Sequence, residues 1–326
     1  MSKPKVAFYW CASCGGCEEA IVDLAERLLD LVQKVDIVFW PVALDYKLSD
    51  VETMADKSID ACLINGGIRT TENEKVAKLL RAKSKVVIAF GACSAWGGVP
   101  GLANLSSTAD ILDLIYGGSP TKDNRQNTGP TESINAGVDL KLPTLLAQVE
   151  PLDRVIDVDY YVPGCPPTPD VTWKALTTIL SGELPRRGSV IGAESKALCY
   201  SCPLAETKPE KIAIKEFKRP TEFSPDLSKC LMVQGLPCLG PVTRGGCGAL
   251  CIKGGMPCTG CFGPTDHVKD FGAKAVTYLA SILDLEDEDE IDRELSKIVD
   301  IIGLSQRYSL PASILQRRTP RRKVGT

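Results

Sequence analysis

Twelve of the fourteen cysteines in this chain of 326 residues fall into groups whose number and spacing suit inorganic centres. Four lie apart in the first half, at Cys14, Cys17, Cys93 and Cys165. Eight lie close together in the second half, at Cys199, Cys202, Cys230, Cys238, Cys247, Cys251, Cys258 and Cys261. Because a cubane iron-sulfur cluster is held by four cysteine thiolates, this number corresponds to three four-cysteine centres.

The remaining composition narrows the kind of centre. His267 is the only histidine, so the chain has no imidazole set for a catalytic zinc, copper or facial-triad iron site. The sequence opens with no secretory or twin-arginine signal, and no apolar stretch is long enough to cross a bilayer. We therefore expect a soluble, cytoplasmic protein without membrane insertion. In a reducing cytosol, so many cysteines favour metal binding over disulfides.

Charge gives no case for a nucleic acid partner, because 38 basic and 41 acidic residues nearly cancel. The basic run at residues 317–323 is interpreted as a solvated tail, and the acidic run at residues 284–290 as a solvated connection.

Apolar strands alternate with amphipathic helices in the first half of the chain. Strands are predicted at residues 6–10, 35–40, 59–64, 85–90 and 155–162, and helices at residues 18–32, 72–82 and 172–180. Strand, helix, strand in this order predicts a parallel sheet that is covered on both faces, with right-handed crossovers. The fold class is therefore α/β, a flavodoxin-like, doubly wound sheet.

Three regions are expected along the chain. A flavodoxin-like domain at residues 1–180 includes an insertion at residues 100–149 with a short helix at 109–115, and a linker follows at 181–188. The cysteine-rich domain, residues 189–267, has too few periodic apolar residues for a core of its own, so metal centres would have to organise it. Helices at 268–283 and 291–302 form the last region, residues 268–326.

The four early cysteines each follow a predicted strand. Cys14 and Cys17 come after the first strand, Cys93 after the fourth and Cys165 after the strand at 155–162. In an open parallel sheet, ligands bind beyond the carboxyl ends of the strands, so these loops bring four thiolates to one point. Their glycines let backbone amides approach a cluster. A thioredoxin-like pair at Cys14 and Cys17 is the alternative, but it leaves Cys93 and Cys165 unexplained.

The eight late cysteines by themselves also suit two zinc sites, because zinc is often held by four thiolates in C-x-x-C pairs. Together with the first set, electron transfer is the better account. Cys11 and Cys62 remain outside the three sets. Both are interpreted as buried strand-end thiols, with Cys62 near enough to the sheet edge to approach the first set.

These motifs resemble those of the small subunit of nickel-iron hydrogenases. The resemblance comprises C-x-x-C-x-E from Cys14 to Glu19, a glycine pair after Cys93, and P-G-C-P-P around Cys165. The related complex I subunit has two adjacent cysteines in the first motif, whereas Gly15 and Gly16 separate them here. The resemblance extends from residue 6 to about residue 264.

The resemblance implies three [4Fe-4S] clusters. Cys14, Cys17, Cys93 and Cys165 would hold the proximal cluster, which faces the nickel-iron centre of a separate large subunit. Cys247, Cys251, Cys258 and Cys261 would hold a medial cluster, in which Cys251 replaces the proline of three-iron relatives. Cys199, Cys202, Cys230 and Cys238 would hold a distal cluster, with cysteine in place of the usual first histidine. An interleaved assignment of these eight stays open.

By the same resemblance, the protein is an oxidoreductase subunit that relays electrons from H2 and has no catalytic residue of its own. It is most similar to the gamma or small subunit of the methanogen F420-non-reducing, methyl-viologen-reducing hydrogenase. That enzyme is associated with heterodisulfide reductase, so a small iron-sulfur subunit is the expected electron acceptor. The alternatives are the gamma subunit of F420-reducing hydrogenase, a complex I-like quinone reductase subunit and a non-redox zinc-binding module.

Overall fold

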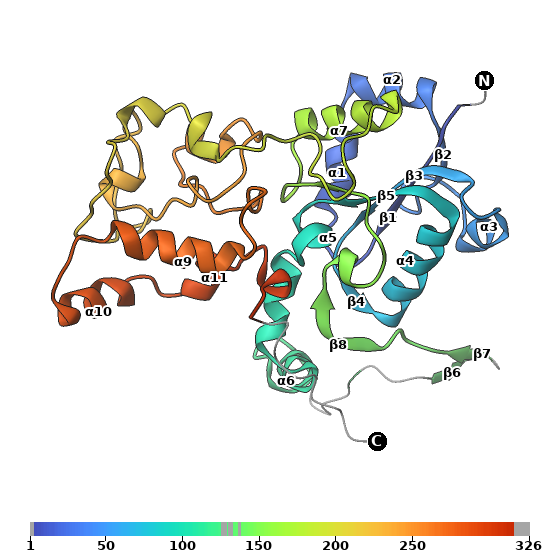
Figure 1. Ribbon diagram of the computed structural model, residues 1–326. Helices are drawn as coiled ribbons and strands as arrows, with labels where there is room; N and C mark the ends of the chain where they lie inside the picture. Colours follow the sequence, from blue (N-terminus) through green and yellow to red (C-terminus); the bar gives the residue numbers. More distant parts are fainter. Residues whose placement is uncertain (1–2, 125–128, 130–132, 136–137, 316–326) are drawn as a thin grey trace.

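A five-stranded parallel β-sheet lies at the centre of the first half of the molecule (Figure 1). The computed structural model describes residues 3–124, 129, 133–135 and 138–315. The strands are β1 (Lys5–Trp10), β2 (Asp36–Phe39), β3 (Ile59–Asn65), β5 (Ser84–Phe90) and β9 (Tyr160–Val162), in the spatial order β2-β1-β3-β5-β9. Counted along the chain, this is the 2-1-3-4-5 order of flavodoxin-like folds. The predicted fold class is confirmed.

Helices cover both faces of this sheet (Figure 1). One face carries α1 (Gly16–Val22), α2 (Glu26–Lys34) and α7 (Pro169–Ser181), and the other carries α3 (Leu48–Thr53) and α4 (Thr71–Lys83). Side chains of β1 alternate between the two cores, since Val6 and Phe8 face α1 while Ala7 faces α4. Burial on both faces explains why the strands are apolar along their length.

Two predicted elements of the sheet domain differ from the structure. The helix expected at residues 18–32 is broken into α1 and α2, because Ala25 adopts a φ of 51° and Leu24 turns into the core. The strand expected at 155–162 is paired only over β9. The 3-10 turn η3 (Leu152–Arg154) lies just before the expected strand. No glycine or proline marks the break at Ala25, so the apolar period alone could not locate it.

The insertion is fastened to the sheet domain at its end. It contains η1 (Val99–Leu105), α6 (Thr108–Asp113), the π-helical turn η2 (Leu114–Gly118), β6 (Ser133–Asn135), β7 (Val138–Leu140) and β8 (Leu145–Glu150). Strand β8 pairs antiparallel with β4 (Ile68–Thr70). The Asn104 amide nitrogen donates to the Val149 carbonyl oxygen at 3.0 Å, and the Asn104 amide oxygen accepts from the Val149 nitrogen at 2.7 Å. Strand pairing and the Asn104 side chain therefore hold the two ends of the insertion against the sheet domain.

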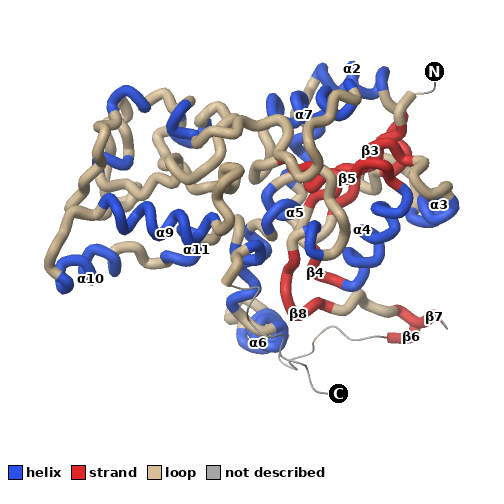
Figure 2. The backbone as a smooth tube through the Cα atoms, viewed as in Figure 1, coloured by secondary structure: helices blue, strands red, loops and turns tan. Residues whose placement is uncertain are grey.

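The second half of the molecule consists mostly of loops (Figure 2). Its elements are η4 (Leu198–Tyr200), η5 (Ala205–Thr207), η6 (Met232–Gln234), α8 (Leu250–Lys253), α9 (Phe271–Ile282), α10 (Glu288–Ser296), α11 (Ile301–Ser305) and η7 (Leu310–Ala312). The helix expected at 268–283 is α9. The helix expected at 291–302 is instead two helices, because Asp300 caps α11 by accepting from the Gly303 nitrogen at 2.7 Å.

A hydrophobic core joins the cysteine-rich loops to α9. The expectation that these loops lack apolar residues for a core is wrong in part, since Leu198, Phe217, Met232, Leu239 and Ile252 are buried together. Helix α9 adds Phe271, Ala275, Leu279 and Ile282 to the same cluster. The boundaries proposed at residues 180–189 and 267–268 stay predictions, and the second of them divides this core.

The charged runs have different outcomes. Glu288, Asp289 and Glu290 of the expected acidic connection form the first turn of α10. Negative side chains there stabilise the helix by interacting with the positive end of its dipole. The basic run at 317–323 lies outside the described residues. Within the described residues, no helix combines the length and apolar character needed to cross a membrane.

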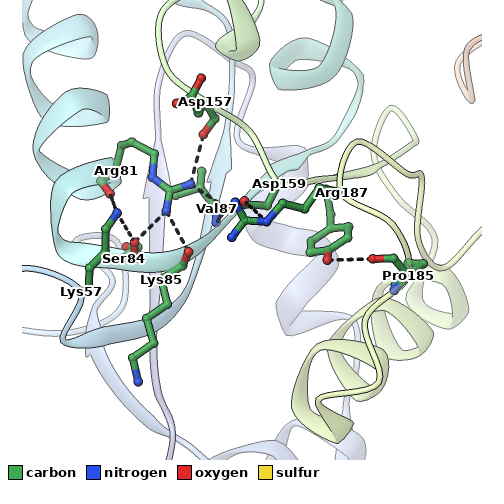
Figure 3. Close-up of polar contacts among 10 residues, drawn as sticks. Lys57, Arg81, Ser84, Lys85, Val87, Asp157, Asp159, Pro185 and Arg187 are labelled. Atoms are coloured by element: carbon green, nitrogen blue, oxygen red, sulfur yellow. Dashed lines mark hydrogen bonds and ion pairs between the residues drawn. The ribbon is translucent and has the colours of Figure 1, made fainter.

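A buried carboxylate fastens the edge strand β9 to its neighbours (Figure 3). The Asp159 side chain is 5% exposed and pairs with Arg81 at 2.6 Å and with Arg187 at 3.2 Å. It also accepts from the Val87 nitrogen at 2.8 Å. The segment expected as a linker is therefore partly held against the sheet, through Arg187 and through Tyr160, whose hydroxyl donates to the Pro185 oxygen at 2.9 Å.

We expect Asp159→Asn to lower the free energy of unfolding by about 3 kcal/mol, because it removes the charge that compensates the largely buried Arg81. Denaturant unfolding of both proteins measures the difference. Glu74→Gln is the control, since it breaks the exposed pair with Lys78 and should cost about 0.5 kcal/mol or less. Equal midpoints for Asp159→Asn and the control would show that this network adds little stability.

Candidate metal centres

The first four cysteines meet at the carboxyl ends of the sheet strands. Cys14 and Cys17 lie at the start of α1, Cys93 lies in α5 (Ala92–Trp96) just after β5, and Cys165 follows β9. Backbone hydrogen bonds join the last two loops, from Gly91 to Val162 at 2.8 Å and from Ala92 to Gly164 at 2.7 Å.

Electrostatics show that these four thiols are mutual neighbours. Burial raises the pKa of Cys17 most, and Cys93, Cys165 and Cys14 each raise it further. The pKa of Cys93 rises to about 12, mainly through burial and then through Cys165 and Cys14. Neighbouring thiols that disfavour a charge on Cys17 and Cys93 form a site suited to a cationic centre.

Glycines allow these loops to approach one another. Gly91 has a φ of 86°, and a Cβ atom there would collide with the Cys17 sulfur. A Cβ atom at Gly16 would lie 3.4 Å from the Cys14 sulfur and 3.7 Å from Pro166. The glycine pair after Cys93 has a similar role, since Cβ atoms at Gly97 and Gly98 would strike Pro311 and Cys93. The C-terminal turn η7 therefore packs on the Cys93 loop.

A buried carboxylate, that of Glu18, anchors the loop that carries Cys14 and Cys17 through a chain of hydrogen bonds. Glu18 is 8% exposed and accepts hydrogen bonds from the indole of Trp40 and the amide of Asn65. Asn65 in turn accepts from the Ser13 hydroxyl at 3.1 Å, and that hydroxyl oxygen accepts from the Gly15 nitrogen at 3.2 Å. Burial raises the pKa of Glu18. The sequence analysis did not find this network, because its members are far apart along the chain.

A second set of four thiols surrounds an apolar cavity. Cys199, Cys202, Cys230 and Cys238 all line it. The pKa of Cys199 rises to about 12, first through burial and then through Cys238, and burial raises that of Cys238 to about 11. Gly240 keeps the backbone close, since a Cβ atom there would lie 3.4 Å from the Cys199 sulfur and 3.6 Å from the Cys238 sulfur.

Two further side chains line this cavity, and no motif in the sequence indicated that they would. Lys208 lowers the pKa of both Cys199 and Cys202, although burial outweighs it. Tyr278 of α9 reaches the same cavity, and burial, followed by Cys199 and Cys238, raises its pKa. Its hydroxyl is buried and has no hydrogen-bond partner within the described residues.

The third set lies between the other two. Burial raises the pKa of Cys261 to about 12, and Cys251, Cys247 and then Cys165 of the first set add to the shift. Burial also raises the pKa of Cys258, with Cys238 of the second set as the largest thiol contributor. The Cys258 nitrogen donates to the Cys238 sulfur at 3.3 Å. The three sets therefore form a continuous row, and Cys258 stands where the second and third sets meet.

Tyr308 also lies along this row. Its hydroxyl is 3.1 Å from that of Thr259, and both Cys261 and Cys165 help to raise its pKa after burial. Since Tyr308 follows the cysteine-rich segment by many residues, only the return of the chain to the sheet domain brings it there.

The two remaining cysteines lie apart from the row. Cys11 and Cys62 belong to the core between the sheet and α4, whereas Cys17 belongs to the core on the other face. Burial raises the pKa of Cys62 to about 12, and its other contributors are Ser84 and Arg81. Cys62 is a strand thiol of the core, as one reading of the sequence expected.

Four thiols in each set are donors of the kind that iron-sulfur clusters use. Within the described parts of the chain, no three His, Cys, Asp or Glu side chains are grouped tightly enough for one metal ion. In a four-iron cluster each cysteine binds its own iron, so the ligands surround a larger body. The cavity lined by Cys199, Cys202, Cys230 and Cys238 has that form, and the orphaned Tyr278 hydroxyl points to a polar occupant.

The chain is similar to known proteins over most of its length. A family model described as NADH ubiquinone oxidoreductase, 20 Kd subunit, matches residues 14–179. The chain is 42% identical to an iron-sulfur subunit of the F420-non-reducing hydrogenase of Archaeoglobus profundus, over 96% of this chain and 98% of that protein. It is 37% identical to a subunit of the F420-non-reducing hydrogenase of Methanothermobacter marburgensis, over 96% of each.

A solved structure gives the same fold. The H2-activated [NiFeSe]-hydrogenase of Desulfomicrobium baculatum matches with a TM-score of 0.51 and 17% identity, over 82% of this chain and 96% of the matched chain.

The fold and the matched region define the class of protein, which is that of the NADH ubiquinone oxidoreductase 20 Kd subunit, and the chain belongs to this family. More narrowly, it is a homologue of hydrogenase iron-sulfur subunits of the F420-non-reducing type, which are subunits of oxidoreductases.

We expect Gly91→Ala to lower the iron content of the purified protein, because the new methyl group displaces Cys17 from its set. Gly182→Ala is the control. Gly182 also has a positive φ, of 75°, but open space surrounds its Cβ position. Both variants carry a backbone strain of about 1–3 kcal/mol, which is higher at Gly91, where ψ is 163°, and only Gly91→Ala also disturbs a thiol. Equal iron contents would contradict the close approach.

Proposed function

We propose that this chain is the electron-transfer small subunit of a cytoplasmic nickel-iron hydrogenase. A separate large subunit oxidises H2, and this chain conducts the electrons away through three [4Fe-4S] clusters. The observation that carries the proposal is the row of thiol sets, in which Cys165 neighbours Cys261 and Cys258 neighbours Cys238. A row of adjacent redox centres serves electron transfer, whereas two structural zinc sites require no such alignment.

Each set is assigned to one cluster. Cys14, Cys17, Cys93 and Cys165 bind the proximal cluster, Cys247, Cys251, Cys258 and Cys261 the medial one, and Cys199, Cys202, Cys230 and Cys238 the distal one. The mutual shifts within the first and second sets support this partition. Cys258 is the cysteine that could most readily belong to the distal cluster instead of the medial one, because Cys238 raises its pKa more than Cys261 does.

The large subunit is proposed to cover the sheet edge at the first set. Cys14 is exposed there, and the neighbouring Trp10 is 40% exposed and lies against Gly15. An exposed tryptophan beside a redox site suits a protein interface. Covering it would also exclude water from the proximal cluster, whose potential depends on solvent exposure.

Electrons are proposed to leave at the other end of the row. Tyr200, next to Cys199, is 76% exposed, so the second set lies near the protein surface. The acceptor is a small iron-sulfur subunit that links this enzyme to heterodisulfide reductase, as in the methanogen enzymes that the motifs resemble. Similarity to F420-non-reducing hydrogenases over nearly the full chain supports this branch over a complex I-like quinone reductase.

Metal analysis of anaerobically purified protein tests the proposal. Three four-iron clusters require about twelve iron and about twelve acid-labile sulfide per chain. We expect this content, a brown colour, and electron paramagnetic resonance signals after reduction. Zinc in place of iron, in protein never exposed to air, would exclude the relay.

The ends of the row should respond differently to ligand removal. Cys165→Ala should stop electron flow from H2 to any acceptor, because the first centre connects to the large subunit. Cys230→Ala should keep H2 isotope exchange but slow acceptor reduction. Cys11→Ala is the control and should retain all three clusters, since Cys11 lies in the sheet core. Full acceptor reduction by Cys165→Ala would refute the order of the clusters.

A further inference from the structure

Tyr278 occupies an unusual place in the second cysteine set. It lies in the middle of α9, and its ring packs against the core that α9 shares with the cysteine-rich loops. Its hydroxyl oxygen is buried and has no hydrogen-bond partner within the described residues. The same side chain lines the cavity formed by Cys199, Cys202, Cys230 and Cys238.

A buried hydroxyl without a partner is costly. Leaving such a group unbonded costs about 1–3 kcal/mol, so native structures rarely retain one without a reason. Phenylalanine would fill the same volume in α9 without that cost. The cavity wall otherwise consists mainly of apolar residues and thiols, including Leu198, Met232 and Ile252. The occupant of the cavity is therefore the partner that the hydroxyl lacks.

We propose that the Tyr278 hydroxyl donates a hydrogen bond to a sulfur atom of the distal [4Fe-4S] cluster and thereby sets its reduction potential. This inference rests on the proposed function, since it requires a cluster in that cavity. Tyr278 is a positioning residue and not a ligand. It keeps its proton, and it forms no bond to iron.

The direction of the effect follows from charge. One-electron reduction makes the cluster more negative, so a donor to its sulfur stabilises the reduced form more than the oxidised form. Loss of the donor should therefore lower the potential. The phenol suits this role because it adds a donor without adding a second charge beside Lys208, which also lines the cavity.

The test uses Tyr278→Phe in the anaerobically purified native complex. Redox titration followed by electron paramagnetic resonance gives the potential of the distal cluster, whose signal is identified by its loss in Cys230→Ala. We expect roughly a tenfold fall in the ratio of reduced to oxidised distal cluster at a fixed potential, which is about 59 mV for one electron. The other two clusters should keep their potentials.

A second readout separates a hydrogen bond from a change in packing. Electron-nuclear double resonance in H2O and D2O detects the exchangeable protons coupled to the distal cluster. Tyr278→Phe should remove one of these couplings and leave those of backbone amides, such as the Cys258 amide that donates to the Cys238 sulfur. Tyr116→Phe is the control. Tyr116 lies in η2 of the insertion, where its ring contacts Lys122, and its loss should change neither readout.

Each outcome decides the inference. An unchanged potential or an unchanged set of exchangeable-proton couplings in Tyr278→Phe overturns it, with iron still at about twelve per chain, the content of three four-iron clusters. Loss of the distal cluster in Tyr278→Phe also overturns it, because the hydroxyl would then be needed for assembly and not for tuning. Wild-type protein without a signal that Cys230→Ala removes would instead refute the proposed function, on which the inference depends.

Discussion

Burial of thiols beside other thiols is the constraint on which the rest of this structure depends. Metal binding requires thiolates, yet burial and neighbouring thiols raise the pKa of Cys93 to about 12 and that of Cys238 to about 11. A bound cationic centre reverses this preference, because it supplies a positive charge to every thiolate in the set. Cluster binding therefore releases protons and contributes directly to folding, above all in the loop-rich second half.

The two halves of the molecule position their thiols by different means. In the first half, parallel strands end at a common edge, and hydrogen bonds such as Gly91 to Val162 align the loops that follow. In the second half, no sheet is available among the described residues, and a hydrophobic core centred on α9 holds the loops. The sheet therefore positions the first set, and packing against α9 positions the loops of the second half.

Side chains behind the cysteines complete each site. Glu18, Trp40 and Asn65 support the first loop, Tyr308 lies between the first and third sets, and Tyr278 faces the second. Groups of this kind orient ligands and tune a centre without binding it. Two of them, Tyr278 and Tyr308, come from the C-terminal part of the chain, which carries no cysteine after Cys261. The C-terminal elements therefore help to enclose the cysteine sets.

The sequence by itself determined the parallel sheet and the twelve thiols, because apolar strands, amphipathic helices and cysteine spacing are local patterns. It also placed Cys14, Cys93 and Cys165 at one sheet edge, since strand ends meet there by rule. Only the tertiary structure decided the break at Ala25, the shared core under the loops, and the positions of Glu18, Tyr278 and Tyr308. These features depend on contacts between residues far apart along the chain, such as α9 against the second cysteine set, and no local pattern records them.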